Sequence, residues 1–381
     1  MNKREDFLPF CRHQLGKEEE QAVLEVLQSA WITTGPVTDA FEREFAARVG
    51  TPHAVAASSC TGGLFMVCQA LGIGPGDEVV VPALTWPATA NAPVMLGAKV
   101  VFADVDYKTL CVTRESIEPC LNDDTKAVAI VHFAGLSCEL DSITGLCRER
   151  GIMLIEDSAH ALGSKYNGRH VGGQYAVASV YSFHPIKNIT TGEGGMITCH
   201  DAALYEKLSL CKFHGISRDA WKAYKGGGIP LYDLEWPALK FNFTDLQAAI
   251  GRVQLGRLDA FNERRRQIAR CYLSELAGVS GLDLPADSDG HAWHLFVVKL
   301  NKQAQIQRDG FICRMRELNV GIGIHFLPVN ELTFYKKQNP LVTPHAEKAG
   351  RTCVSLPLYP MMQDRDVCYV VDCIKHILGG Q

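Results

Sequence analysis

The chain has 381 residues, a mass of 41.8 kDa and a formal net charge of −4 at pH 7. Hydrophobic residues make up 47% of it and charged residues 21%, which is typical of a globular enzyme and excludes a disordered or fibrous protein. No basic block and no aromatic-interleaved Lys/Arg patch is present, so we expect no nucleic-acid partner.

The first ten residues, MNKREDFLPF, contain no apolar stretch of the length that a signal peptide needs. The longest apolar run, at residues 127–136, is interrupted by His132 and is too short to span a membrane. None of the 14 cysteines forms a C-x-x-C pair, and we expect them to be small buried side chains in a reducing compartment. These features predict a cytoplasmic protein with no membrane partner.

Two helices are predicted next. Residues 17–30 begin with acidic residues and place apolar residues on one face, and Phe41, Phe45 and Val49 follow at helical spacing after the break WITTGP at 31–36. From residue 54 onward, short apolar segments alternate with helical ones. The predicted strands are 54–57, 79–81, 100–104, 127–131, 153–156 and 178–183, and the helices between them include 62–71, 87–96 and 141–149.

Near-continuous apolar strands with helical crossovers predict a mostly parallel sheet that is covered on both faces. A long charged helix is predicted at 245–277, followed by strands near 293–300 and 320–326. We therefore expect an α/β protein with a large, mostly parallel-sheet domain at 1–250, which includes the N-terminal helices. A smaller C-terminal α+β domain would occupy 251–381.

Two polar stretches follow predicted strands. SSCTGG at 58–63 contains Thr61 and Gly62 at a helix start, where small residues let a phosphate approach free backbone amides. Ser and Thr are also common N-caps, so the stretch has a purely structural alternative. IEDSAHA at 155–161 ends a strand with Asp157, which at the carboxyl edge of a parallel sheet could pair with a protonated ring nitrogen or cap the next helix.

Two further features fall at the same predicted edge. Lys187 lies five residues beyond a strand in SFHPIKNITTGEGG, a loop rich in Ser, Thr and Gly of the kind that carries function. Its neighbour His184 is either a ligand-binding or a structural residue. Trp86 follows the strand at 79–81, and it either belongs to the core or stacks on a flat cofactor.

Together these stretches supply a phosphate cup, a carboxylate, a stacking ring and a lysine able to form an aldimine, which is what pyridoxal phosphate requires. Each of them follows a predicted strand. No G-x-G-x-x-G follows a strand, and the His and Cys spacings match no metal motif, so we expect neither a dinucleotide fold nor a bound metal.

At these stretches the chain resembles the DegT/DnrJ/EryC1/StrS family of sugar aminotransferases, which are fold-type I pyridoxal-phosphate enzymes. The resemblance covers nearly the whole chain. Its most specific motifs are GPGDEVVVPALTWPAT, IEDSAHALGSKYNGRHVG and SFHPIKNITTGEGGMI. Within the family the chain is similar to UDP-4-amino-4-deoxy-L-arabinose–oxoglutarate aminotransferases in the segments 30–36, 212–221, 291–296 and 323–326.

The resemblance implies a role for each matching position. Lys187 would form the aldimine and Asp157 would pair with the pyridinium nitrogen. Other cofactor contacts would come from Thr61, Gly62, Trp86, His160, Ser182 and Asn242. Asn242 would reach the phosphate of the neighbouring subunit, which implies a homodimer with shared active sites. The substrate would meet Thr33, Thr34, His184, His294 and His325, although His294 also fits a core position on its apolar strand.

The implied reaction is ping-pong transamination from L-glutamate to a 4-keto-sugar carried on a nucleotide, with UDP expected. The sugar would be destined for lipid A in lipopolysaccharide biosynthesis, or for another surface polysaccharide. Alternatives are amination at C3 and a PLP-binding regulator without turnover. A sugar dehydratase is disfavoured because those enzymes replace the aldimine lysine with histidine. CTGG at 60–63 and HPIK at 184–187 depart from the arabinose-type ATAG and HAIK, which leaves the exact sugar open.

Overall fold

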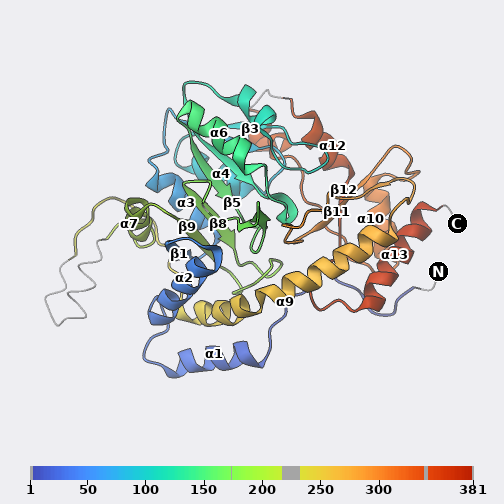
Figure 1. Cartoon of the computed structure of the whole chain (residues 1–381), viewed down its shortest axis with the longest axis horizontal. Coiled ribbons are helices and arrows are strands. Elements are labelled where there is room, and N and C mark those ends of the chain that lie inside the picture. Colours follow the sequence, from blue (N-terminus) through green and yellow to red (C-terminus); the bar gives the residue numbers. More distant parts are fainter. Residues whose placement is uncertain (1–2, 173, 217–231, 339–341, 380–381) are drawn as a thin grey trace.

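The computed structural model describes residues 3–172, 174–216, 232–338 and 342–379. Its centre is a seven-stranded sheet with the order β1-β9-β8-β5-β4-β2-β3 (Figure 1). All neighbours from β8 to β3 are parallel, and β9 is antiparallel to both β8 and β1. The predicted mostly parallel sheet is therefore confirmed. Its strands are β1 (His53–Ala57), β2 (Glu78–Pro82), β3 (Lys99–Ala103), β4 (Thr125–Val131), β5 (Met153–Asp157), β8 (Ala178–Ser182) and β9 (Gly195–Cys199).

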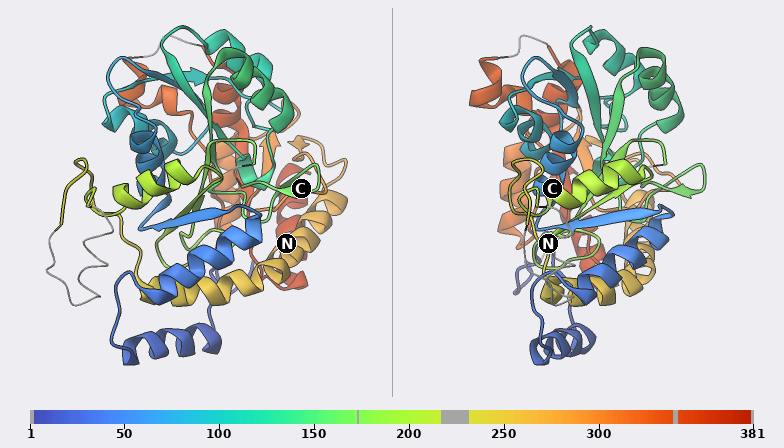
Figure 2. Two further views of the ribbon diagram at one scale, coloured as in Figure 1. Left: turned by 60° about the vertical axis from the view of Figure 1, so that its left-hand side comes forward. Right: turned by 90° about the vertical axis from the view of Figure 1, so that its left-hand side faces the viewer.

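Helices cover both sides of this sheet (Figure 2). The predicted helices agree with the observed bounds to within a few residues. A two-stranded hairpin of β6 (Lys165–Tyr166) and β7 (Arg169–His170) lies apart from the sheet. The helices of this part of the chain are α1 (Lys17–Gln28), α2 (Pro36–Val49), α3 (Cys60–Ala70), α4 (Pro87–Met95), α5 (Arg114–Ile117), α6 (Leu140–Arg150) and α7 (Ala202–Cys211), with 3₁₀ turns η1 (Glu118–Cys120) and η2 (Phe133–Gly135).

The long helix α9 (Asp245–Glu275) connects the two cores of the molecule (Figure 1). Thr244 caps its first turn by accepting the N–H of Gln247. Its first half packs Leu255 and Leu258 against the aromatic core under the large sheet, and its second half packs Tyr272 into the C-terminal core. The predicted domain boundary after residue 250 falls inside this helix.

The C-terminal core is an antiparallel three-stranded sheet with flanking helices, an α+β arrangement. Leu8 is buried in this core and pairs with Val320, so the N-terminal segment packs with the C-terminal part; the division at 250/251 stays a prediction. The elements here are β10 (Leu282–Asp283), β11 (Phe296–Leu300), α10 (Arg308–Glu317), η3 (Val329–Glu331), α11 (Thr333–Lys336), α12 (Pro344–Thr352), β12 (Cys353–Leu356) and α13 (Asp364–Leu378).

Three sequence expectations need correction. Residues 320–326 make only isolated bridges, at Val320 and Gly323, because the glycines at 321 and 323 offer no side chains for a sheet face. Strands β6, β7, β9, β10 and β12 were not predicted. All 14 cysteines are free, as expected, but Cys313 and Cys368 are exposed.

Within the described ranges, no helix is long and apolar enough to cross a bilayer.

Candidate active site

A cavity of about 320 Å³ lies at the carboxyl ends of the parallel strands, a size that suits a small-molecule ligand. It brings together eight of the residues that the sequence singled out. They are Thr61, Trp86, Asp157, His160, Ser182, His184, Lys187 and His325. These side chains come from loops far apart in the sequence, and they converge because parallel strands end at one edge of the sheet.

Lys187 sits in a closed loop after β8. The loop is held by two bonds, from Phe183 N–H to the Gly194 carbonyl (2.9 Å) and from Thr191 N–H to the Phe183 carbonyl (3.1 Å). Burial lowers the pKa of Lys187 from 10.5 to about 8, and the neighbouring Cys60 and Asp157 act in the opposite direction. The amine therefore has a substantial neutral, nucleophilic fraction at mildly alkaline pH.

Asp157 ends β5 with its carboxylate fixed from two sides. Its Oδ2 accepts the hydroxyl of Thr89 at 2.8 Å, and its Oδ1 accepts the N–H of Ala159 at 3.1 Å. Burial raises the pKa of Asp157, while these hydrogen bonds and Lys187 lower it. A cationic ring nitrogen in the cavity would stabilise the ionised form of this buried carboxylate.

The first turn of α3 contributes to the cavity wall through Cys60 and Thr61. Ser59 is the N-cap and accepts the N–H of Gly62 at 3.0 Å, so that amide is already used. Thr61 is exposed in the cavity and lies in the first helical turn, where backbone N–H groups attract anions. Gly195 comes so close that a Cβ there would lie 2.6 Å from the Cys60 nitrogen. The stretch predicted to bind a phosphate therefore does line the cavity, through Ser59, Cys60 and Thr61. The N–H of Gly62 is used to cap the helix.

Aromatic rings line the cavity, and Trp86 and His160 each lie against Phe326. Trp86 is 62% exposed, so it is not a core residue. The His160 ring is buried, accepts the Ala134 N–H at its Nδ1 (3.3 Å), and lies 5.8 Å from the Phe326 ring in a stacked arrangement. Burial lowers the pKa of His160 well below its usual value. This histidine is therefore neutral, with its proton on Nε2.

The other predicted contact residues lie elsewhere. Asn242 donates to the Thr34 hydroxyl at 2.8 Å beside the start of α9, and Thr33 accepts the Asp245 N–H there. None of these three lines the cavity within this chain. His294 is buried behind His160, with ring centroids 4.4 Å apart, as the core alternative anticipated. Residues 217–221 of the similar segment 212–221 lie outside the described residues.

Sequence reasoning missed three residues of this site. Thr89 orients Asp157 through a hydrogen bond, and its hydroxyl also bonds to that of Thr85, four residues earlier. The T-x-x-x-T spacing in ALTWPAT was the sequence feature that could have indicated this pair. Phe326 lines the cavity from the C-terminal part of the chain, beyond the reach of local patterns.

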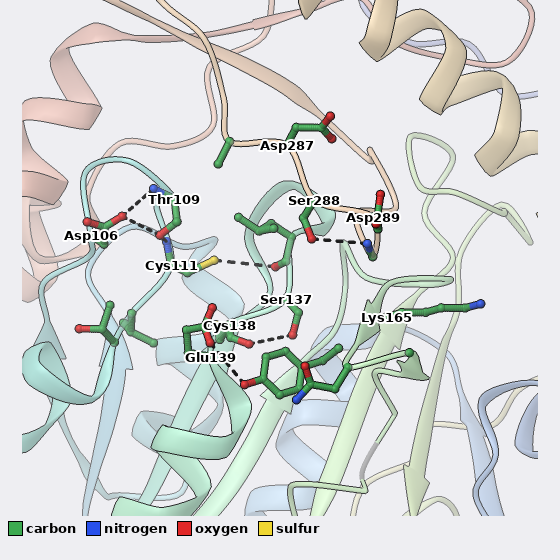
Figure 3. A pocket seen from close by; sticks show the side chains of 18 residues that line it. Asp106, Thr109, Cys111, Ser137, Cys138, Glu139, Lys165, Asp287, Ser288 and Asp289 are labelled. Atoms are coloured by element: carbon green, nitrogen blue, oxygen red, sulfur yellow. Dashed lines mark hydrogen bonds between the residues drawn. The ribbon is translucent and has the colours of Figure 1, made fainter.

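A larger cavity of about 670 Å³ lies apart from these residues (Figure 3). Its wall contains the carboxylates of Asp106, Glu139, Asp287 and Asp289 and a single lysine, Lys165. Asp106 is bonded to its own loop through Thr109, and Glu139 accepts the Tyr166 hydroxyl. The starts of α5 and α6 reach this wall through their N-caps Thr113 and Glu139, but four carboxylates against one lysine do not suit a phosphorylated cofactor. Among the described residues, no group of three or more His, Cys, Asp or Glu could hold a metal.

The smaller cavity fits pyridoxal phosphate: it has a half-buried lysine of lowered pKa, a carboxylate held by two hydrogen bonds, a helix start and flanking rings. With the mostly parallel α/β sheet, this defines a fold-type I pyridoxal-phosphate-dependent transferase. The chain belongs to the DegT/DnrJ/EryC1/StrS aminotransferase family, whose model matches residues 13–375.

Three relatives illustrate the family. The spore coat polysaccharide biosynthesis protein SpsC of Bacillus subtilis (strain 168) is 42% identical over 387 residues, covering 100% of this chain and 99% of SpsC. The aminotransferase TlmJ of Streptoalloteichus hindustanus superposes with a TM-score of 0.91 at 34% identity, covering 98% and 99% of the two chains. Spr1654 of Streptococcus pneumoniae in its PLP-form gives 0.91 at 29%, with 98% and 99% covered. The family and cofactor are established; membership of the arabinose-type subgroup is not.

The lowered pKa of Lys187 predicts how the apoenzyme takes up its cofactor. Below about pH 8 the amine is protonated and cannot attack a carbonyl, so the uptake rate should rise roughly tenfold per pH unit and level off above about pH 8. Stopped-flow absorbance of apoenzyme mixed with pyridoxal phosphate measures this rate. A rate that keeps rising to about pH 10, as for an unperturbed lysine, would contradict the effect of burial.

Proposed function

We propose that the protein transfers an amino group from L-glutamate to a nucleotide-linked 4-keto-sugar, with UDP as the nucleotide. The observation that carries the catalytic part is that the half-buried Lys187 and the buried Asp157 line one cavity, with the pKa of the lysine lowered to about 8. The sugar and the donor are supported by the family and by the sequence resemblance.

The bound cofactor supplies an electron sink for the carbanion formed when the donor loses its α-proton. In the proposal, Lys187 binds the cofactor carbonyl and, once displaced, carries the proton between the two carbon positions. Asp157 keeps the ring nitrogen protonated, and Thr89 holds Asp157 in place. Thr61 and Ser182 bind the phosphate at the start of α3, where Gly62 lies beside Thr61 with its own N–H donated to Ser59.

Ring and substrate contacts complete the proposal. Trp86 and His160 flank the cofactor ring from the cavity walls. His184 and His325 line the same cavity, and His325 is oriented by Ser355 through a bond of 2.8 Å at Nδ1. Burial lowers the pKa of His325 to about 4, so it would contact the sugar as a neutral group. We assign His294 to the support of His160, because it does not line the cavity.

We also propose a homodimer in which Asn242, Thr33 and Thr34 complete the partner's site, since they lie together outside the cavity of their own chain. Mixing Asn242→Ala with Lys187→Ala protein tests this. In an equal random mixture about half the dimers are mixed, and each holds one intact site, so activity should recover to about a quarter. Recovery would be absent if Asn242 served its own subunit, and an active monomer by light scattering would also contradict it.

Substrate specificity is tested with a panel of UDP-, dTDP- and GDP-linked 3-keto and 4-keto sugars. With L-glutamate as donor, the UDP-linked 4-keto sugar should release 2-oxoglutarate fastest. Faster turnover of a 3-keto sugar would favour C3 amination, and turnover of none would favour a PLP-binding regulator. All sugars in the panel are chosen without a charged group, so that rates differ only through the position of the keto group and the identity of the nucleotide.

The sugar's destination follows from the resemblance and from one relative. Because SpsC is named for spore coat polysaccharide biosynthesis, we propose that the aminated sugar enters a surface polysaccharide. UDP-4-amino-4-deoxy-L-arabinose and lipid A modification remain the more specific predictions of the sequence. A cytoplasmic location agrees with a nucleotide-linked substrate and is part of the same proposal.

A further inference from the structure

The turn at residues 132–138 lies between the cofactor cavity and the C-terminal part of the chain. It follows β4 and contains η2, in which Ala134 and Gly135 both have left-handed backbone conformations, with φ of +58° and +96°. A residue other than glycine keeps such a conformation only where its surroundings fix it, and residues held in this way are concentrated at functional sites. The turn is therefore expected to be held by specific contacts.

The backbone of this turn contacts the His160 loop on one side and residues 292–295 on the other. The Ala134 N–H donates to Nδ1 of His160 at 3.3 Å, and the Ala134 carbonyl accepts the Leu295 N–H at 3.2 Å. The Gly135 carbonyl accepts the Ala292 N–H at 3.0 Å, and a Cβ at position 135 would lie 3.0 Å from the His160 carbonyl oxygen. A displacement of the turn would therefore move the donor that fixes the proton of His160 on Nε2.

The side chain of His132 closes this turn. It is fully buried and does not line the cofactor cavity. Its Nδ1 accepts the N–H of Cys138 at 3.1 Å, which joins the two ends of the turn. Accepting at Nδ1 places the ring proton on Nε2, which faces Oε1 of the buried Glu156 at 3.9 Å. That distance is longer than a hydrogen bond, so the bond at Nδ1 is the contact that fixes the ring.

The backbone of His132 forms a separate contact with the site. Its N–H donates to the carbonyl oxygen of Asp157 at 3.3 Å, at the point where β4 and β5 end side by side. A substitution of the His132 side chain keeps this backbone bond. It removes only the acceptor for the Cys138 N–H, and a buried N–H without an acceptor is costly enough to make the turn rearrange.

We propose that His132 is a positioning residue for the transamination. Its ring closes the turn at 132–138 and thereby holds the Ala134 N–H against Nδ1 of His160. His132 acts through His160, whose ring lines the cavity with a single proton on Nε2. The inference rests on the role proposed above for His160 beside the cofactor ring.

Two isosteric substitutions separate the ring nitrogens of His132. His132→Asn places its side-chain oxygen near the position of Nδ1 and keeps an acceptor for Cys138, whereas His132→Gln reaches the position of Nε2 and leaves the Cys138 N–H without one. Both remove the packing of the ring, so both should lower the thermal midpoint.

Kinetics of the holoenzyme with L-glutamate and a keto-sugar should differ between the two variants. His132→Gln should lower kcat between about tenfold and 10²-fold with KM changed far less, because misplaced active-site groups have effects of this size. His132→Asn and the exposed control His200→Gln should stay within about threefold of the wild type. Equal losses of kcat in the two His132 variants, or wild-type kcat in His132→Gln, would overturn the inference.

Nitrogen-15 NMR of labelled histidine rings tests the positioning without turnover, with the signals of His160 identified by their loss in His160→Gln. In the wild type and in His132→Asn, His160 should carry one proton, on Nε2; in His132→Gln its Nδ1 signal should shift as the Ala134 bond is lost. A wild-type His160 protonated on Nδ1 would overturn the inference, even if no variant folds, and so would an unchanged His160 in His132→Gln. A wild-type protein inactive with L-glutamate would contradict the proposed function, and these NMR signals would still decide the positioning of His160.

Discussion

Lys187→Ala is expected to lower kcat by more than about 10³-fold, because it removes the covalent anchor of the cofactor and the group that moves the proton. The variant should also lose the absorbance band that borohydride bleaches in the wild type. Steady-state rates with L-glutamate and a keto-sugar, together with absorbance spectra, measure both effects.

A matched control separates this role from a general effect of lysine loss. Lys99 is a strand residue whose side chain is 77% exposed, and Lys99→Ala should retain wild-type activity and spectrum. Added cofactor should not rescue Lys187→Ala, since binding is not the only step affected. Full activity of Lys187→Ala would rule out the proposed chemistry.

Asp157→Asn should lower kcat by about 10²–10³-fold, the usual cost of losing one preorganised charge in an active site. Asparagine is nearly the same size and can still accept the Ala159 N–H and bond to Thr89, so the fold should be unaffected. Without the carboxylate the ring nitrogen loses its proton, and the cofactor becomes a weaker electron sink. The KM values should change far less than kcat.

Thr89→Val provides the graded comparison for Asp157. It removes one hydrogen bond to a charged carboxylate, worth about 1.5–3 kcal/mol, so kcat should fall by at most about 10²-fold. The exposed Asp123→Asn serves as the neutral control. If Asp157→Asn kept wild-type kcat while Thr89→Val lost activity, the assignment of Asp157 as the partner of the ring nitrogen would be wrong.

Much of the site could be predicted from the sequence because of one geometric rule. Asp157, Lys187 and Trp86 each follow a strand of a parallel sheet, and such strands end together, so local patterns were enough to group them. The apolar strands themselves stood out because both faces of the sheet are buried.

What the sequence could not show depends on contacts between distant segments. Leu8 pairs with Val320, and Phe326 reaches the cavity from the C-terminal part, although nothing in their local sequence indicates it. Strand β9 begins at Gly195, at the end of the glycine-rich stretch that follows Lys187, and glycine weakens the sequence signal of a strand. Arg265 lies on the charged helix predicted at 245–277, and only the folded structure reveals that it is buried.

The most direct test of the account is a single half-reaction, with holoenzyme and L-glutamate mixed in the absence of any keto-sugar. We predict about one 2-oxoglutarate per active site, released as the visible cofactor absorbance disappears, and recovery of that absorbance when the UDP-linked 4-keto-sugar is added. No 2-oxoglutarate from the holoenzyme, or release only when both substrates are present together, would contradict transamination through Lys187.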